Sequence, residues 1–107
     1  MDDHAIVGAD ASGIIQLWSS GAETLFGHAT AQAVGKTLDL IVPEAFRDQH
    51  WNGFRHAMAV GSSKLDGQST EIPVRCQDGG TVVFKASFML LRDAARKVIG
   101  ALVIFDR

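Results

Sequence analysis

The sequence predicts a single α+β domain in which one antiparallel sheet carries its helices on one face. Two strand-like segments open the chain of 107 residues, helical patterns fill its middle, and three strand-like segments close it. Strands separated by a helical middle favour an antiparallel sheet with the helices on one side. Apolar residues make up 47% and charged residues 21% of the chain, which is ordinary for a globular protein. We therefore expect residues 1–107 to form one domain with one core.

The first half of the chain predicts a hairpin followed by short helices. The segments AIVGA and IIQLW, within residues 5–18, are expected to be strands joined by the turn residues ADASG. Ser20 and Glu23 have the spacing of a capping box, so a helix is expected to begin there and to end at Gly27. A further helical turn is expected at residues 30–34.

A long central helix is predicted at about residues 43–60, because proline suits a first helical turn and a glycine follows the pattern. At about 100° per residue, four side chains share one narrow stripe: Phe46, His50, Phe54 and Ala57. Trp51 flanks this stripe and His56 lies well off it. We therefore expect His50 to face the interior and His56 to face water.

Period-two alternation in the second half predicts three strands, at residues 70–76, 81–91 and 98–105. The segment QDGG is a hairpin signal between the first two strands. The polar segment RDAARK connects the second and third. One face of these strands is expected to turn inward, with the following side chains: Thr70, Ile72, Phe84, Ala86, Phe88, Leu102 and Ile104.

Composition argues against several classes of function. The net charge is -2 and no basic cluster is evident, so direct nucleic-acid binding is not expected. Cys76 is the only cysteine, which excludes an intramolecular disulfide and a Cys-x-x-Cys zinc site. No apolar run approaches the roughly 20 residues of a membrane helix, and the N-terminus lacks a signal pattern. We expect a cytoplasmic segment without a membrane span.

Catalytic motifs are also not apparent. No G-x-S-x-G elbow occurs, and the glycines of GADASG fit neither a P-loop nor a dinucleotide fingerprint. The four histidines lack the i, i+4 pairing of helical metal sites. We therefore expect no enzymatic activity and no metal site built from paired histidines.

The order of these elements, together with three quoted segments, resembles the PAS domain family. The segments are GIIQLWSSGAETLFGHATAQAVGKTLDLIVPE at residues 13–44, the DGG turn at 78–80, and the terminal VIGALVIFD. Ser19 replaces the asparagine usual after the strand aromatic, and a serine can also cap the helix. The resemblance implies a PAS fold with a five-stranded antiparallel sheet. It also implies a sensory or dimerisation module that binds a small molecule or cofactor between the sheet and the long helix.

The resemblance also suggests where a ligand would bind. His50, Trp51 and Phe54 on the long helix would border the pocket, together with the inward strand residues named above. The segment FRDQHWNGF is similar to the helix of oxygen-sensing haem PAS kinases, in which a histidine binds the haem iron, so His50 would be the proximal ligand. Those proteins carry an arginine on the next strand where the DGG register places Thr70.

Three interpretations of His50 therefore stay open: a haem ligand, a polar group of a small-molecule pocket, or a buried residue with local hydrogen bonds, and we favour the last of these. Phe84 and Phe88 are bulky where haem would need room, so we do not expect haem. A light-sensing flavin is disfavoured as well, because Cys76 lies beside the DGG turn rather than in a helical Asn-Cys-Arg-like motif.

The resemblance implies a bacterial signal-transduction module within a longer protein. We expect a homodimeric sensor that relays ligand binding to a C-terminal output domain, either the histidine kinase of a two-component system or a transcription regulator. The alternative is a module for dimerisation alone, with the contact at residues 1–4 and in a segment beyond Arg107.

Overall fold

The computed structural model describes residues 4–107, which form a five-stranded sheet and a set of helices. The strands are β1 (His4–Asp10), β2 (Ile15–Trp18), β3 (Ser69–Arg75), β4 (Thr81–Arg92) and β5 (Val98–Asp106). The helices are α1 (Ser20–Phe26), α2 (Thr30–Ala33) and α3 (Arg47–Val60), with short 3-10 turns η1 (Leu38–Leu40) and η2 (Glu44–Phe46).

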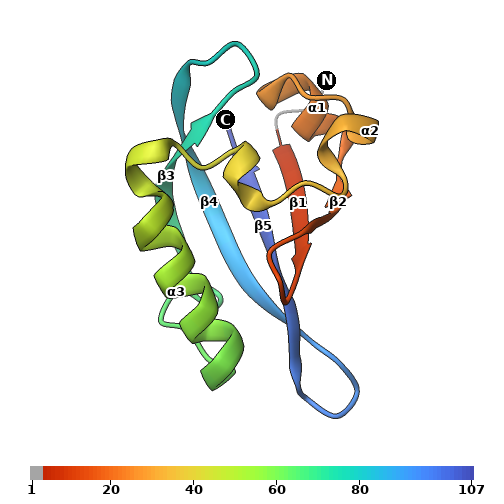
Figure 1. Cartoon of the computed structure of the whole chain (residues 1–107), viewed down its shortest axis with the longest axis vertical. Coiled ribbons are helices and arrows are strands. Elements are labelled where there is room, and N and C mark those ends of the chain that lie inside the picture. Colours follow the sequence, from red (N-terminus) through yellow and green to blue (C-terminus); the bar gives the residue numbers. More distant parts are fainter. Residues whose placement is uncertain (1–3) are drawn as a thin grey trace.

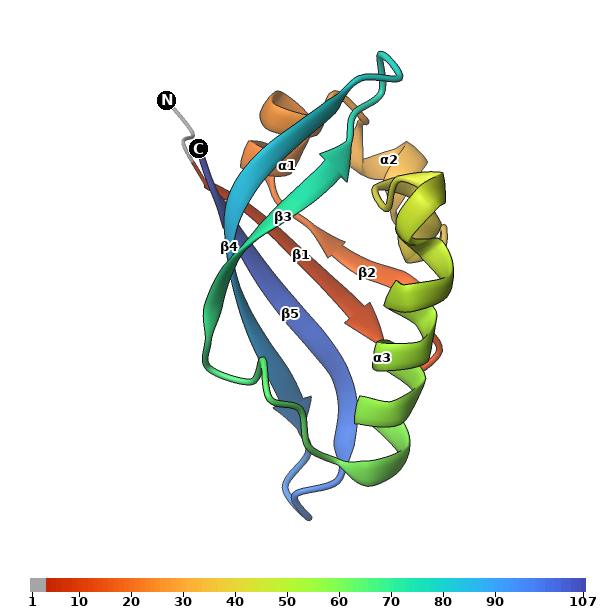
Figure 2. The ribbon, with the colours of Figure 1, turned by 90° about the vertical axis from the view of Figure 1, so that its left-hand side faces the viewer.

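The sheet has the strand order β2-β1-β5-β4-β3, and every neighbouring pair is antiparallel. The helices gather on one face of the sheet, and α3 packs against β4 and β5 (Figure 1, Figure 2). The predicted fold class is thus confirmed. The first and last strands pair with each other, so that His4 lies opposite Asp106 and the two side chains hydrogen-bond.

The β1–β2 turn is held by one carboxylate. Asp10 Oδ1 accepts hydrogen bonds from the backbone N–H groups of Ser12, at 2.9 Å, and Ile14, at 3.1 Å. Gln16 Nε2 donates to the other carboxylate oxygen at 2.9 Å. These bonds, that from Ile14 above all, lower the pKa of Asp10 from its ordinary value. Gly13 completes the turn with φ 81°, a conformation that favours glycine.

Helix α1 begins one residue earlier than the capping-box pattern predicts. Ser19 is the N-cap: its hydroxyl accepts from the backbone N–H of Ala22 at 3.1 Å and from that of Ile6 at 2.8 Å. Glu23 instead accepts from the backbone N–H of Thr30 and so ties α1 to α2. The box prediction is wrong because the end of β2 places Ser19, rather than Ser20, beside the free amides of the first turn.

The central helix is close to its prediction at its C-terminal end. Gly61 takes φ 79° and its N–H donates to the carbonyl of Ala57 at 2.8 Å, which ends α3 as expected. At the other end, the first turn is the separate 3-10 turn η2. Because a 3-10 turn advances the chain by a different angle, Phe46 leaves the predicted stripe and is 45% exposed. His56 faces water as expected.

The inner face of β5 differs from the prediction. Phe105 pairs with Ala86, and Ala101 with Leu90, so these residues share the inner face of the sheet and are buried. Leu102 and Ile104 consequently point to the opposite face, away from α3. The placement of Leu102 and Ile104 in the pocket is therefore wrong, because a strand that is apolar at nearly every position can pair in either phase.

Two clusters make up the hydrophobic core. The larger lies under α1 and is centred on Phe26, whose ring contacts Phe84 and Phe105 edge-on at centroid distances of 5.3 and 5.1 Å. The smaller lies under α3 and contains Phe54 and Ala57. The helix that carries His50 therefore packs on its own part of the sheet.

Candidate functional site

The interface between α3 and the sheet is the candidate site. Phe54 and Ala57 of α3 are buried against three strand residues: Leu90, Val98 and Ala101. Trp51 and Phe88 are partly buried and pack against this cluster. The structure thus brings together four of the predicted site residues: His50, Trp51, Phe54 and Phe88.

His50 is half-buried at the edge of this cluster. Its ring lies edge-on to Trp51 at a centroid distance of 4.9 Å and is tilted over Phe54 at 5.9 Å. Its Nδ1 atom is buried and has no hydrogen-bond partner within residues 4–107. Most buried polar atoms in proteins are hydrogen-bonded, so an unpartnered imidazole nitrogen needs a physical explanation.

The protonation state of His50 follows from its surroundings. Burial among aromatic rings lowers the pKa of His50 from its ordinary value of 6.5, and the nearby Asp39 carboxylate opposes that effect more weakly. At neutral pH the imidazole is therefore uncharged. A neutral imidazole carries one donor and one acceptor nitrogen, and it can also bind a metal.

Trp51 is fixed on both sides. Its Nε1 donates to Asp39 Oδ1 at 2.7 Å, which ties α3 to η1. The far edge of its ring lies over Gly13, where an added Cβ would be 2.3 Å from the Cη2 atom of Trp51. Glycine is thus needed at residue 13 for the close approach as well as for the positive φ. Arg47 also holds Asp39, with Nε 3.8 Å from Oδ1.

The other predicted pocket residues lie elsewhere. Phe84 and Ala86 are buried in the cluster under α1, and Ile72 packs against that cluster. Thr70 lies opposite Ala86 but is exposed on the edge strand. A single pocket lined by all ten predicted residues is therefore not what the fold assembles.

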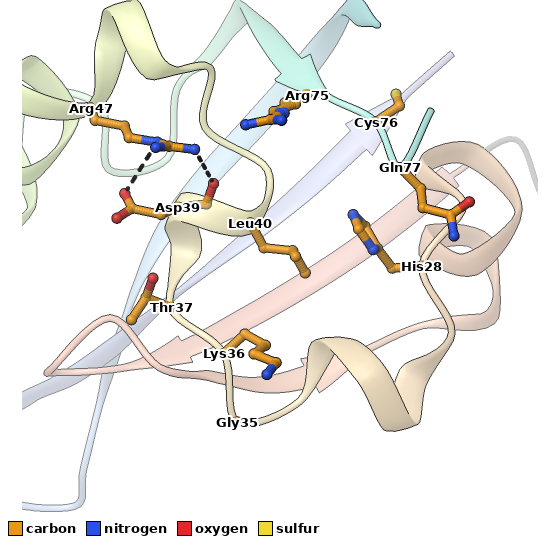
Figure 3. A pocket seen from close by; sticks show the side chains of 10 residues that line it. All are labelled: His28, Gly35, Lys36, Thr37, Asp39, Leu40, Arg47, Arg75, Cys76 and Gln77. Atoms are coloured by element: carbon orange, nitrogen blue, oxygen red, sulfur yellow. Dashed lines mark hydrogen bonds and ion pairs between the residues drawn. The ribbon is translucent and has the colours of Figure 1, made fainter. Parts of the chain in front are cut away.

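A separate cleft of about 550 Å³ lies between the helical segments and the end of β3 (Figure 3). Its lining comes from the segment after α1, the α2–η1 loop, η1, the start of α3, and the end of β3 with the two residues after it: His28, Gly35, Lys36, Thr37, Asp39, Leu40, Arg47, Arg75, Cys76 and Gln77. No local sequence pattern predicts this cleft. Its basic residues are spread over three segments, so no local cluster signals it.

Cys76, the single cysteine, lies at the edge of this cleft rather than beside His50. Burial is the main cause that raises the pKa of its thiol, and the nearby Asp78 carboxylate adds to the effect. A raised pKa keeps the sulfur protonated and poorly nucleophilic at neutral pH. In the part of the chain that the structure describes, no three His, Cys, Asp or Glu residues form a possible metal site.

A model of the PAS fold family matches residues 3–107, almost the whole chain. The chain belongs to the PAS family. This PAS domain is 41% identical over 77 residues to the sensor protein FixL of Bradyrhizobium diazoefficiens, an alignment that covers 72% of the chain and 15% of FixL. It is 25% identical over 68 residues to the oxygen sensor protein DosP of Escherichia coli, which covers 64% of the chain and 8% of DosP.

Among solved structures, the PAS domain of a protein from Colwellia psychrerythraea superposes with a TM-score of 0.80 at 24% identity, covering 97% of this chain and 86% of that one. That likeness shows the PAS fold. The chain spans well under a fifth of the length of FixL and DosP, and is a sensory PAS domain by its family. None of the helices within residues 4–107 is long and apolar enough to cross a membrane.

Proposed function

We propose that this PAS domain senses a small molecule bound between α3 and the sheet, with His50 as its polar anchor. The observation that carries the proposal is the buried, unpartnered Nδ1 of His50 in an apolar cluster. Ligand pockets usually combine an apolar lining with a few polar groups that orient the ligand. A ligand that hydrogen-bonds to Nδ1 would satisfy that atom and would contact Trp51 and Phe54.

Signalling in this proposal is a shift between two arrangements of α3 on the sheet. Helix α3 touches the sheet through the small cluster at Phe54 and Ala57, and it touches the β1–β2 turn through Trp51, which lies over Gly13. A ligand beside His50 binds one arrangement more tightly and so raises its population. The strand that ends at Asp106 would pass this change to a C-terminal output domain, either a histidine kinase or a transcription regulator.

Ligand screening with a matched pair of variants tests this proposal. Compounds are screened by thermal shift and native mass spectrometry against the wild type, His50→Phe and His56→Phe. We expect a ligand that binds the wild type and His56→Phe equally, since residue 56 faces water on the same helix, and that binds His50→Phe at least tenfold more weakly. Ligands that bind all three proteins with equal affinity would contradict the role of His50.

Haem is the second candidate occupant, because one relative is named an oxygen sensor and His50 lies on the interior side of α3. A neutral imidazole in an apolar shell fits an iron ligand. His50 would hold the iron, and Trp51, Phe54 and Phe88 would surround the macrocycle. Bound haem would supply an iron atom that binds a gas molecule. A Soret band with hemin in the wild type and in His56→Ala, but not in His50→Ala, is the expected result. No band in the wild type rejects haem.

We further propose that the domain is a cytoplasmic homodimer, with the outer face of the sheet as the contact. The apolar side chains of that face include Ile6, Leu17, Met89, Leu102 and Ile104. Most of the contact expected at residues 1–4 falls on residues 1–3, outside the described residues. Light scattering should show a dimer for the wild type and for Val60→Glu on α3, and a monomer for Ile104→Glu. A monomeric wild type would refute the proposal.

A further inference from the structure

The cleft between the helical segments and the end of β3 has a different lining from the α3–sheet interface. Leu40 of η1 lies at its floor, and its walls include the α2–η1 loop, the end of β3 and the start of α3 (Figure 3). Its volume of about 550 Å³ lies within the range of roughly 300–1,000 Å³ that is typical of small-molecule sites. The cleft is therefore large enough for an organic molecule.

Positive charge dominates the lining. Lys36, Arg47 and Arg75 face the cleft together with His28, whereas Asp39 is the single acidic residue among the lining side chains. Arg47 is already engaged, because its guanidinium donates to the carbonyl oxygens of Asp39, at 3.3 Å, and Val42, at 3.2 Å. Its Nε also lies 3.8 Å from the Asp39 carboxylate, which partly neutralises both groups.

Among the described residues, the side chains of Lys36 and Arg75, unlike that of Arg47, are not engaged by other side chains or carbonyl groups. Within residues 4–107, neither takes part in a side-chain hydrogen bond or an ion pair. They belong to separate walls, since Lys36 follows α2 and Arg75 ends β3. Figure 3 shows the Arg75 guanidinium and the His28 ring extending toward the space beside Leu40. Two unpaired cations thus flank an apolar floor.

We propose that this cleft binds a small organic dianion, with one carboxylate or phosphate group on Lys36 and the other on Arg75. The planar guanidinium forms paired hydrogen bonds with either group, and the lysine ammonium adds a second charge-assisted contact. Leu40 supplies apolar contact for the body of the ligand. His50 is not among the lining residues, so this second site goes beyond the proposed function.

Both tryptophans connect this cleft to the rest of the fold. Trp18 Nε1 donates to the carbonyl of the lining residue His28 at 2.9 Å. Trp51 Nε1 donates to the carboxylate of the lining residue Asp39 at 2.7 Å. A dianion in the cleft therefore changes the surroundings of both indole N–H groups. Trp51 in turn contacts the ring of His50.

Nuclear magnetic resonance on the 15N-labelled chain tests this site. Citrate, adenosine 3′,5′-bisphosphate and inorganic phosphate are titrated at constant ionic strength, with the two indole N–H signals as the readout. We expect both signals to move in a saturable way with citrate or with the nucleotide, and which of these binds more tightly identifies carboxylate or phosphate as the recognised group. Amides of the turn at residues 93–97, remote from the cleft in sequence and absent from its lining, should not move.

Three variants decide whether the cleft is responsible. Arg75→Gln and Lys36→Gln should each raise the dissociation constant at least tenfold, whereas Lys97→Gln, in the β4–β5 turn, should leave it unchanged. His50→Phe should also leave it unchanged, which separates this site from the one under α3. Signals that never saturate, inorganic phosphate binding as tightly as both organic anions, or equal affinity in Arg75→Gln would overturn the proposal.

Discussion

Replacing His50 by phenylalanine should stabilise the domain while it removes the polar anchor of the proposed ligand site. Phenylalanine keeps a ring against Trp51 and Phe54, has a similar helix propensity, and removes the buried Nδ1 that has no partner. An unsatisfied buried polar group costs about 1–3 kcal/mol. Some of that gain is offset by fitting a larger ring, so we expect the free energy of unfolding to rise by about 1–2 kcal/mol.

Urea denaturation monitored by tryptophan fluorescence measures this change. In a domain of this size, 1 kcal/mol corresponds to about 4 °C or more in Tm, so the shift is also visible in a thermal melt. His56→Phe is the control, because a surface substitution on the same helix should stay within about 0.5 kcal/mol. If His50→Phe lowered the free energy of unfolding by more than about 1 kcal/mol, Nδ1 would have a partner such as ordered water. Nδ1 would then not be free to bind the proposed ligand.

Three further predictions follow from local geometry. Burial lowers the pKa of His50, so protonation of its ring opposes folding. The free energy of unfolding should therefore fall as the pH drops from 6.5 through the lower folded-state pKa. Urea midpoints compared across pH should show that His50→Phe lacks this pH-dependent loss of stability. Gly13→Ala should lower the free energy of unfolding, measured by urea denaturation, by at least about 3 kcal/mol, because the new Cβ meets the Trp51 ring. Gly79 also has a positive φ but faces open space, so Gly79→Ala should lower that free energy by only about 1–2 kcal/mol. Equal losses in the two variants would argue against the Trp51 contact. Ser19→Ala should cost about 1–2 kcal/mol in urea denaturation, since two backbone N–H groups lose their acceptor, and a change below about 0.3 kcal/mol would contradict the cap.

The parts of the fold that follow from local pattern were predictable from the sequence. The hairpin signals marked the strand ends, and the helical phase correctly separated His50 from His56 on α3. The inner face of β4 was also recognised, because polar Lys85 and Ser87 alternate with Phe84 and Ala86 and so identify the faces.

The parts of the fold that depend on tertiary pairing were not predictable from the sequence. In β5 the residues from Ala101 to Phe105 are all apolar, so alternation could not choose between Leu102 and Val103; pairing with β1 and β4 decides it. Phe46 was misplaced because a 3-10 turn interrupts the helical phase. The basic cleft escaped notice because the chain brings Lys36 and Arg75 together only when the η1 segment docks on β3, where the Arg75 N–H donates to the carbonyl of Ile41 at 2.9 Å.

The pairing of β1 with β5 has a consequence for how this domain can be rearranged. His4 and Asp106 lie opposite each other, so a short linker could join the two ends without crossing the sheet. New ends could then be opened in the exposed β4–β5 turn at residues 93–97, where the cut would remove few buried contacts. Such a circular permutant should fold with its strand order unchanged, and it would move the points of attachment to the opposite end of the sheet.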